Sequence, residues 1–302
     1  MLKRMSLWST IEKMYALQIK KTVKIQDVYL IQAASGSYCL KGYDFPEEDV
    51  RFIARVFSFL EERGFTRGQR VYATAEQDSY IRHGGVFYTV TNWVPGKRPL
   101  FRRRKDFKSA IRTLAKFHSM AAGFPKDEAP GGRIRYAGLH DEVSEYKKVL
   151  SRYKNTKHLV PACDEALYGL SQPKVLQAVE AEQNAAALVH GDYNYPNLIK
   201  DSRGKTHLID FENTSLNARM KDLSHILHRN FLWNGSGMLR WVDYYDNKRP
   251  LNDNDLHLLH ALLTAPYHVV RNIKIGGIRN AKSVTPSSQR LNKFQRELRE
   301  LL

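Results

Sequence analysis

The chain has 302 residues, a length that suits one large domain or two lobes, and its hydrophobic content of 42% is ordinary for a globular protein. It has no apolar run of about 18 residues, no apolar signal core and only two isolated cysteines, so we expect no membrane span, no export, no disulfide framework and a reducing cytosol. The formal net charge of +17 predicts attraction to polyanions such as ATP, acidic glycans, nucleic acid or anionic protein layers.

The first part of the chain predicts a short helix followed by antiparallel strands. Residues 6–18 carry apolar side chains at helical spacing, and the segments that follow are rich in β-branched residues. Strands are expected at residues 22–26, 28–33 and 38–41. Lys41 ends the third strand, where an ammonium group is costly to bury unless an anion meets it. The alternative is a surface lysine on an edge strand.

A second helix and a hairpin follow. The helix is expected over residues 46–63, because Pro46 and the three acidic residues after it suit a first turn. The hairpin is expected from residues 79–83 and 86–94. A proline and a glycine end its second strand, and they place a lobe boundary after residue 94.

The remainder of the chain is predicted to be mainly helical. It begins with a dense basic patch, but no zinc-finger spacing or aromatic RNA-binding sequence accompanies the patch, which disfavours nucleic acid as a partner. The final third is rich in aromatic residues and is the expected wall of an acceptor pocket. The basic patch comprises Lys97, Arg98, Arg102, Arg103, Arg104 and Lys105. Helices are expected at residues 106–122, 140–153 and 173–184.

The strongest chemical signal lies in the segment LVHGDYNYPNLIKDSRGKTHLIDF. An apolar run leads to Asp192, and residues 198–200 and 206–209 predict a hairpin whose facing residue numbers sum to 407. Asn197 would then face Asp210 at about 4.5–5.5 Å between Cβ atoms, close enough for both side chains to hold one hard cation. A carboxylate base beside such a cation is suited to phosphoryl transfer. The alternative is a plain turn followed by an aspartate that caps a strand.

Further polar residues follow this segment. Glu212 lies on the same side of an extended chain as Asp210 and could supply a second metal ligand or bridge through water. Asp222 precedes a helical run and is expected to cap it. His118 is expected to be a hydrogen-bonded core histidine. The pairs without a metal-binding pattern are expected to be structural or surface residues: His225 with His228, and His257 with His260.

The spacing H-x-D-x-x-x-x-N … D resembles the catalytic and metal loops of the protein-kinase-like superfamily. Its HGD form is similar to the aminoglycoside phosphotransferase and choline kinase branch. In order along the chain, further segments resemble the CotS-type spore coat proteins of that group: YCLKGY, FLEERGF, YTVTNWVPG, LAKFH, VHGDYNYPN, HLIDFE, KDLSHIL and LLTAPYH. The resemblance implies an α+β, bilobal kinase-like fold, with a small antiparallel nucleotide-binding lobe over residues 1–94 and a larger, mainly helical catalytic and acceptor-binding lobe over residues 95–302.

The resemblance also implies roles in catalysis and metal binding. Asp192 is the catalytic base, and Lys41 binds the phosphates of ATP. Asn197 and Asp210 hold Mg²⁺, with Glu212 as a further ligand. A glutamate of the helix over residues 46–63 pairs with Lys41 in this fold, and the candidates are Glu47, Glu48, Glu61 and Glu62. Glu48 is favoured because it is nearer in sequence to the strand that carries Lys41.

Two further segments would contact the nucleotide. Gln26 and Asp27 form the turn that covers the phosphates in this fold, although the turn contains no glycine. Backbone groups of Asn92, Trp93 and Val94 would meet the adenine edge, and the alternative for Trp93 is a core aromatic.

We therefore expect an ATP- and Mg²⁺-dependent phosphotransferase that acts on a hydroxyl of a small molecule or sugar, in the mother-cell cytoplasm or assembled into the spore coat. The alternative is an inactive, kinase-like coat protein that binds polyanions through its basic surface. A protein kinase is disfavoured because HGD replaces HRD and no APE segment follows Asp210. The acceptor, the choice between ATP and GTP, and the oligomeric state are open.

Overall fold

The structure, a computed structural model, describes residues 5–302. It contains two compact units. The first comprises the chain up to Pro99 together with two later segments, Pro125–Arg133 and Leu198–Glu212. The second comprises Leu100–Phe124, Ile134–Asn197 and Asn213–Leu302. The assignment of nucleotide binding and acceptor binding to lobes 1–94 and 95–302 stays a prediction.

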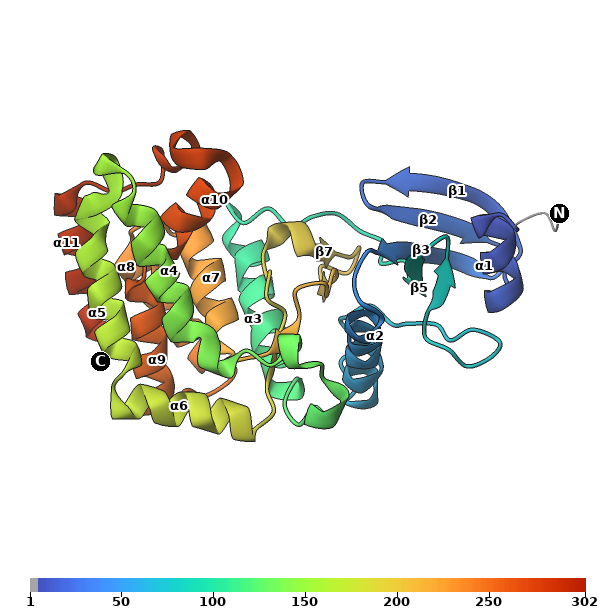
Figure 1. The fold of residues 1–302 in the computed structure, drawn as a ribbon, viewed down its shortest axis with the longest axis horizontal. Coiled ribbons are helices and arrows are strands. Elements are labelled where there is room, and N and C mark those ends of the chain that lie inside the picture. Colours follow the sequence, from blue (N-terminus) through green and yellow to red (C-terminus); the bar gives the residue numbers. More distant parts are fainter. Residues whose placement is uncertain (1–4) are drawn as a thin grey trace. The chain divides into compact units, whose positions relative to one another are not determined.

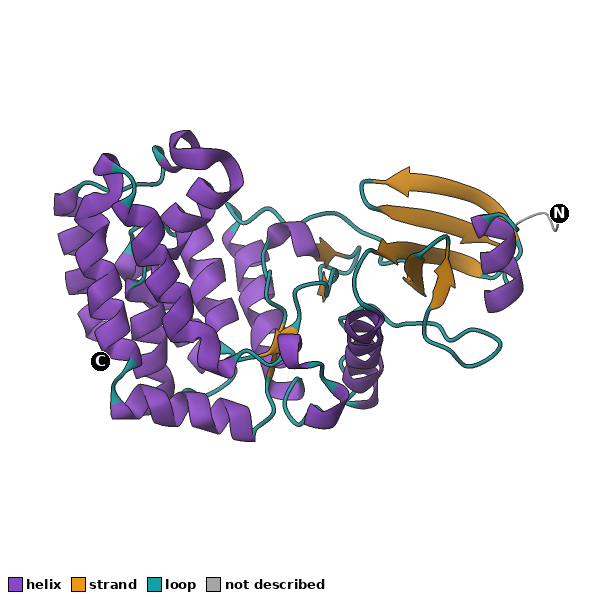
Figure 2. Cartoon of the chain, viewed as in Figure 1, coloured by secondary structure: helices purple, strands orange, loops and turns teal. Residues whose placement is uncertain are grey.

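The first unit is built on a five-stranded antiparallel sheet in the order β1-β2-β3-β5-β4 (Figures 1 and 2). Helix α1 (Leu7–Tyr15) packs through Ile11 and Tyr15 against a buried cluster that includes Leu40 of β3 and Val90 of β5. The strands are β1 (Ile19–Ile25), β2 (Val28–Ala33), β3 (Gly36–Tyr43), β4 (Ile81–His83) and β5 (Val86–Asn92). Because β3 lies between β2 and β5, Lys41 is on a central strand and not on an edge.

Helix α2 (Glu47–Glu62) lies between β3 and β4 in the chain and matches its prediction. Pro46 precedes the helix and three acidic residues occupy its first turn, where they complement the helix dipole. Its predicted apolar stripe is buried: Phe52, Val56, Phe59 and Leu60. Each such side chain contributes about 1.5–3 kcal/mol by burial, so the stripe fixes which face of α2 is turned inward.

A small hairpin, β7 (Leu198–Lys200) with β8 (Thr206–Leu208), also belongs to the first unit. Its pairs are Leu198 with Leu208, Ile199 with His207 and Lys200 with Thr206. The predicted register, with a sum of 407, is wrong by one residue, and the ladder ends before Asn197 and Asp210. The ladder ends there because Tyr195–Asn197 form a 3₁₀ turn and Asp210 has a left-handed backbone with φ of 67°.

The second unit is mainly helical, which confirms the predicted α+β class for the chain (Figures 1 and 2). Helix α9 packs against α5, α6 and α7, and it organises the core of the unit. The helices are α3 (Arg104–Met120), α4 (Leu139–Ser151), α5 (Val160–Leu170), α6 (Pro173–Asn184), α7 (Met220–Asn230), α8 (Gly235–Asp246), α9 (Asp253–Thr264), α10 (Tyr267–Ala281) and α11 (Ser288–Leu298). A two-stranded ladder joins β6 (Leu188–Val189) to β9 (Ser215–Leu216). The sequence did not predict α5 and β9.

Within residues 5–302, no helix is both long and apolar enough to cross a membrane.

Candidate active site

The loop from His190 to Asn197, in the second unit, is held by buried hydrogen bonds. Asp222 of α7 is fully buried, and its carboxylate accepts from the backbone N–H groups of His190 at 2.7 Å and Gly191 at 2.9 Å. The hydroxyl of Tyr193 donates to the backbone carbonyl of Ala110 at 2.7 Å. These bonds fix the backbone on both sides of Asp192.

Gly191 is required at its position in this loop. Its φ is +81°, and a Cβ atom built there would lie 2.2 Å from the carbonyl oxygen of Asn213. Any side chain at this position would therefore push the loop away from the segment that contains Asn213. Position 191 thus favours glycine for a steric reason that is independent of any family pattern.

Asp222 was expected to cap a helix, and this prediction is wrong. The helix begins at Met220 with Arg219 as its N-cap residue, and Asp222 lies inside the first turn. Burial works to raise the pKa of Asp222, but hydrogen bonds from His118 and from the backbone of His190 lower it. Asp222 is thus a buried anion that holds the loop.

His118 is a hydrogen-bonded core histidine, as predicted. Its Nδ1 lies 2.7 Å from the hydroxyl of Tyr245 and its Nε2 lies 3.3 Å from Asp222. Burial lowers its pKa, against the opposing effect of Asp222. The ring therefore supports the aspartate that holds the loop.

Both carboxylate oxygens of Asp192 accept hydrogen bonds from residues of the same unit. Arg229 Nη1 lies 2.6 Å from Oδ1, and the amide nitrogen of Asn197 donates to Oδ2 at 2.9 Å and to the backbone carbonyl of Asp192 at 3.0 Å. The side chain of Arg229 is only 7% exposed, whereas that of Asp192 is 34% exposed. Asp192 is thus a fixed carboxylate that still reaches solvent, as a base for an incoming hydroxyl requires.

Arg229 is a site residue that the sequence reasoning missed. It lies seven positions after Asp222, which places both charged side chains on one face of α7. One of them binds the backbone before Asp192 and the other binds Asp192 itself. Two charges at this spacing among apolar residues were the signal available in the sequence.

Lys41, in the first unit, is surrounded by carboxylates. Its Nζ lies 2.7 Å from Asp210, 2.9 Å from Glu212 and 3.3 Å from Asp27, while its side chain is only 10% exposed. Burial works to lower its pKa, but the charge of Asp210 and hydrogen bonds to Asp210 and Glu212 raise it above the usual value. Lys41 is therefore a charged, inward-facing lysine, and the alternative of a surface lysine on an edge strand is wrong.

Glu48 does not pair with Lys41. It lies exposed in the first turn of α2, and among the described residues the acidic partners of Lys41 within 4 Å are the three named above. The weak sequence argument failed because the carboxylates after β8 reach the lysine instead.

Arg133 connects α2 to the segment that carries Asp210 and Glu212. Its Nε lies 2.5 Å from Asp49 Oδ1 of α2, and its Nη1 donates to the backbone carbonyl of Glu212 at 2.6 Å. The guanidinium is buried over the rings of Phe45 and Phe52, each at 5.8 Å. The helix is therefore fixed to this segment through an arginine that the sequence reasoning did not select.

The residues predicted to hold Mg²⁺ supply only oxygen donors, which is the chemistry that this cation prefers. Because the amide nitrogen of Asn197 is committed to Asp192, its oxygen is the atom left for a cation. Within residues 5–302, no three His, Cys, Asp or Glu side chains are grouped so as to hold a metal, and the predicted set needs only two, Asp210 and Glu212, with the amide. Asn197 belongs to the second unit and the two carboxylates to the first, so this set stays a prediction.

The two predicted nucleotide-contacting segments both lie in the first unit. Gln26 has a left-handed backbone, with φ of 55°, in the turn between β1 and β2, and Asp27 extends from this turn to Lys41 with 64% of its side chain exposed. A phosphate and the Asp27 carboxylate would compete for the same ammonium.

The segment after β5 offers few backbone donors. The N–H of Asn92 donates to Arg70 and that of Trp93 donates to Ser37. Within the described chain the N–H of Val94 donates to no backbone carbonyl, which leaves it as the donor that an adenine edge could use. Trp93 is half-buried and is not a core aromatic.

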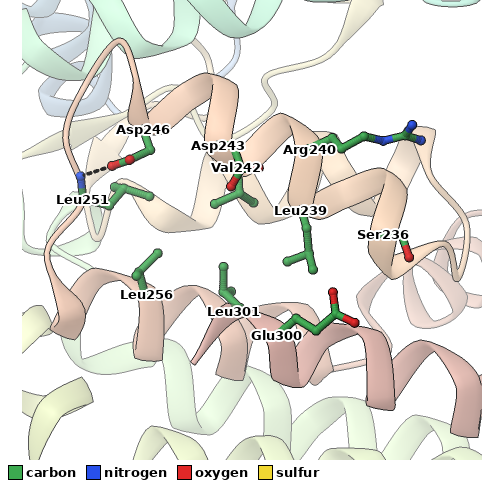
Figure 3. A pocket seen from close by; sticks show the side chains of 10 residues that line it. All are labelled: Ser236, Leu239, Arg240, Val242, Asp243, Asp246, Leu251, Leu256, Glu300 and Leu301. Atoms are coloured by element: carbon green, nitrogen blue, oxygen red, sulfur yellow. Dashed lines mark hydrogen bonds between the residues drawn. The ribbon is translucent and has the colours of Figure 1, made fainter.

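A cavity of about 610 Å³ elsewhere in the second unit takes no residue from the loop 190–197. Figure 3 shows it between α8 on one side and α9 with the C-terminal segment on the other, with leucines on both sides and Asp243, Asp246 and Glu300 among its polar residues. Its lining carries none of the predicted site residues.

Solved structures share this fold at low sequence identity. An aminoglycoside phosphotransferase from Alicyclobacillus acidocaldarius subsp. acidocaldarius DSM 446 is 20% identical, with a TM-score of 0.79 over 98% of this chain and 96% of that chain. Amicoumacin kinase hAmiN, in complex with AMP-PNP, Ca²⁺ and Ami, is 15% identical, with a TM-score of 0.63 over 98% of this chain and 92% of that chain. A microcompartment-associated aminopropanol kinase is 13% identical, with a TM-score of 0.59 over 98% and 94%. These likenesses define the fold as kinase-like and confirm the fold prediction.

The sequence itself defines the family. Residues 24–248 match the profile of APH, the phosphotransferase enzyme family, and the chain belongs to this family. The matched region includes the loop that holds Asp192 and the strand that carries Lys41.

Proposed function

We propose that this protein is an ATP- and Mg²⁺-dependent phosphotransferase that acts on a hydroxyl of a small molecule or sugar. The observation that carries the proposal is the fixed, solvent-reaching carboxylate of Asp192, held between Arg229 and Asn197 on a rigid loop. Family membership supports the reaction class. The amicoumacin kinase bound to AMP-PNP and Ca²⁺ supports a nucleoside triphosphate and a divalent cation as its partners.

In the proposed reaction, the acceptor oxygen forms a bond to the γ-phosphorus of ATP while the bond from that phosphorus to the bridging oxygen of ADP breaks. ADP leaves with the electron pair, and the hydroxyl proton passes to Asp192. Arg229 and Asn197 orient the carboxylate for this transfer, and Lys41 meets the phosphates. A bound Mg²⁺, held by Asn197, Asp210 and Glu212, would supply charge neutralisation at the phosphates.

The substitution Asp192→Asn tests the proposal, because it keeps the shape of the side chain and removes its basicity. Phosphate transfer is expected to fall about 10²–10⁴-fold, whereas the stabilisation of the protein by Mg-ATP in a thermal-shift assay is expected to persist. Transfer at the wild-type rate by the variant would remove Asp192 from the mechanism.

We also propose that the protein acts in the mother cell and is linked to the spore coat. This proposal rests on the resemblance to CotS-type proteins. Localisation of a fluorescent fusion during sporulation tests it. Uniform fluorescence in vegetative and sporulating cells would contradict the assignment.

The alternative is a coat protein that keeps the fold without catalysis and binds anionic coat components. The pairing of Asp27 with Lys41 and the net charge of +17 favour it. A thermal-shift titration separates the two functions: a shift at millimolar Mg-ATP supports the enzyme, and the absence of any shift supports the scaffold.

A further inference from the structure

A cavity of about 400 Å³ in the second unit has an aromatic floor and a basic rim. It is formed by the start of α3, the residue that follows α7, and α8. The floor comprises Phe101, Phe107, Phe231, Trp241 and Tyr244, and the rim comprises Arg102, Arg104, Lys108 and Arg240. Within the described residues, no acidic side chain lines it.

The aromatic floor is rigid. Phe107 is almost fully buried, and its ring centroid lies 4.7 Å from that of Trp241, 4.9 Å from Phe101 and 5.1 Å from Phe231, all in edge-to-face geometry. Trp241 and Tyr244 are half-buried and line the cavity, and Nζ of Lys108 lies 5.1 Å from the centroid of the Tyr244 ring. Such a surface suits the flat face of a ring-shaped ligand.

The positive charges of the basic rim are not paired with carboxylates of the described residues. Arg102, Arg104, Lys108 and Arg240 form no ion pair within 4 Å among residues 5–302. The acidic residue nearest in sequence, Asp106, is buried and accepts the N–H of Leu100 at 3.0 Å. Because Asp106 lies in the first turn of α3 and complements the helix dipole, the positive field at the rim comes from the four side-chain cations. The cavity therefore attracts anions and repels ammonium groups.

No residue of the loop 190–197 lines this cavity, but residues of its floor contact or neighbour residues that hold the loop. Phe101 on its floor packs against Tyr195 of the loop, with ring centroids 6.1 Å apart. Phe231 directly follows Asn230, whose amide donates to Asn194 at 3.2 Å, and Arg229, which binds Asp192. The elements that hold the candidate base thus also form the floor of the cavity.

We propose that this cavity is the acceptor subsite and that the acceptor is an anionic sugar, one that carries a carboxylate or a phosphate. The ring packs on Trp241, and the anionic group meets the arginines of the rim, whose planar forks suit both anions. Acceptors with several ammonium groups are rejected by like charge. This inference rests on the proposed phosphotransferase function and names its substrate class.

The test compares sugars that share one ring and differ in charge. Isothermal titration calorimetry on the full chain, without nucleotide and at low salt, uses glucuronate, glucose 6-phosphate, glucose and glucosamine as probes. At least one of the two anionic sugars is expected to bind ten or more times as tightly as glucose, and glucosamine more weakly than glucose. The stronger of the two anions identifies the preferred group. Equal binding of all four, or preferred binding of glucosamine, overturns the proposal.

Variants of α3 locate the binding site. The double substitution Arg104→Gln and Lys108→Gln removes two rim charges and is expected to weaken binding of the preferred anionic sugar at least tenfold, with glucose unchanged. The matched control, Arg112→Gln and Lys116→Gln, removes the same charge from exposed positions of the same helix outside the cavity. An equal loss in both variants would attribute the effect to net charge and overturn the site.

The inference and the proposed function fail in distinguishable ways. Anion-selective binding without phosphate transfer in the presence of Mg-ATP would overturn the function and leave the anion subsite. Phosphate transfer to glucosamine or glucose, without preference for the anionic sugars, would leave the function and overturn the subsite.

Discussion

Two regions of the molecule carry the predicted chemistry, and they are stabilised in different ways. The loop around Asp192 is held by short hydrogen bonds: the Asp222 carboxylate accepts from the backbone, Tyr193 donates to the Ala110 carbonyl, and Arg229 donates to the Asp192 carboxylate. The cluster around Lys41 consists of one ammonium and three partly exposed carboxylates, any of which can exchange with water or ligand. The comparison separates the proposed base, whose position is fixed, from the proposed phosphate-binding lysine, whose partners can be replaced.

The largest expected effect is at Asp222. The substitution Asp222→Ala leaves two backbone N–H groups and His118 without their buried acceptor, and it is expected to cost about 3–5 kcal/mol in the free energy of unfolding. Urea unfolding followed by circular dichroism measures this cost. The control Asp243→Ala, at an exposed position of α8, is expected to stay within about 0.5 kcal/mol of wild type. Equal stability of both variants would mean that the loop is not fixed by Asp222.

A smaller effect is expected when the lysine of the first unit is removed. The substitution Lys41→Met is expected to weaken binding of ATP by about 1.5–3 kcal/mol, because one charged hydrogen-bond donor to phosphate is lost. The unfolding free energy should change less than in Asp222→Ala, since Asp210 and Glu212 can be hydrated. Lys21→Met, at an exposed position of β1, is the control. Calorimetric titration with ATP measures the difference, and unchanged affinity would exclude Lys41 from the phosphate site.

The smallest effect is expected at Asp27. Because its carboxylate is largely exposed, its pair with Lys41 is worth only about 0.2–1 kcal/mol. The substitution Asp27→Asn removes the competitor for the ammonium and is expected to strengthen binding of ATP by a corresponding amount. The same titration measures it, and the control is Asp44→Asn, at another exposed aspartate of the first unit. Weaker binding in Asp27→Asn would show that Asp27 supports the nucleotide instead of competing with it.

Local patterns in the sequence were sufficient for most of the fold. The helix over residues 46–63 was predicted from its proline, its acidic first turn and its apolar stripe, and the structure has it at Glu47–Glu62. The short strand β9 was missed because two residues are too few to show alternation, and its pairing with β6 depends on tertiary contact. The one-residue error in the β7–β8 register came from the turn, whose geometry the composition of residues 201–204 does not specify.

Site residues that lie close together in the sequence could be predicted from their spacing. Contacts between residues far apart in the sequence could not. Asp192 and Asn197 are five positions apart, and they contact each other as a loop of that length allows. Arg133 reaches Asp49 and Glu212 from a 3₁₀ turn more than 75 positions away from either, and no local pattern marks it. The prediction that Glu48 pairs with Lys41 was wrong because proximity in sequence to β3 does not decide which carboxylate faces the lysine.

The contact of Arg133 with helix α2 has a consequence for regulation. Because Arg133 binds the backbone of Glu212 whereas Lys41 binds its carboxylate, we expect the helix to stay attached whether or not a nucleotide is bound. An on–off control that works by swinging this helix outward would have to break a buried guanidinium pair first. In the proposed enzyme, α2 would therefore keep one position, and the rate of phosphate transfer would depend on the concentrations of its substrates.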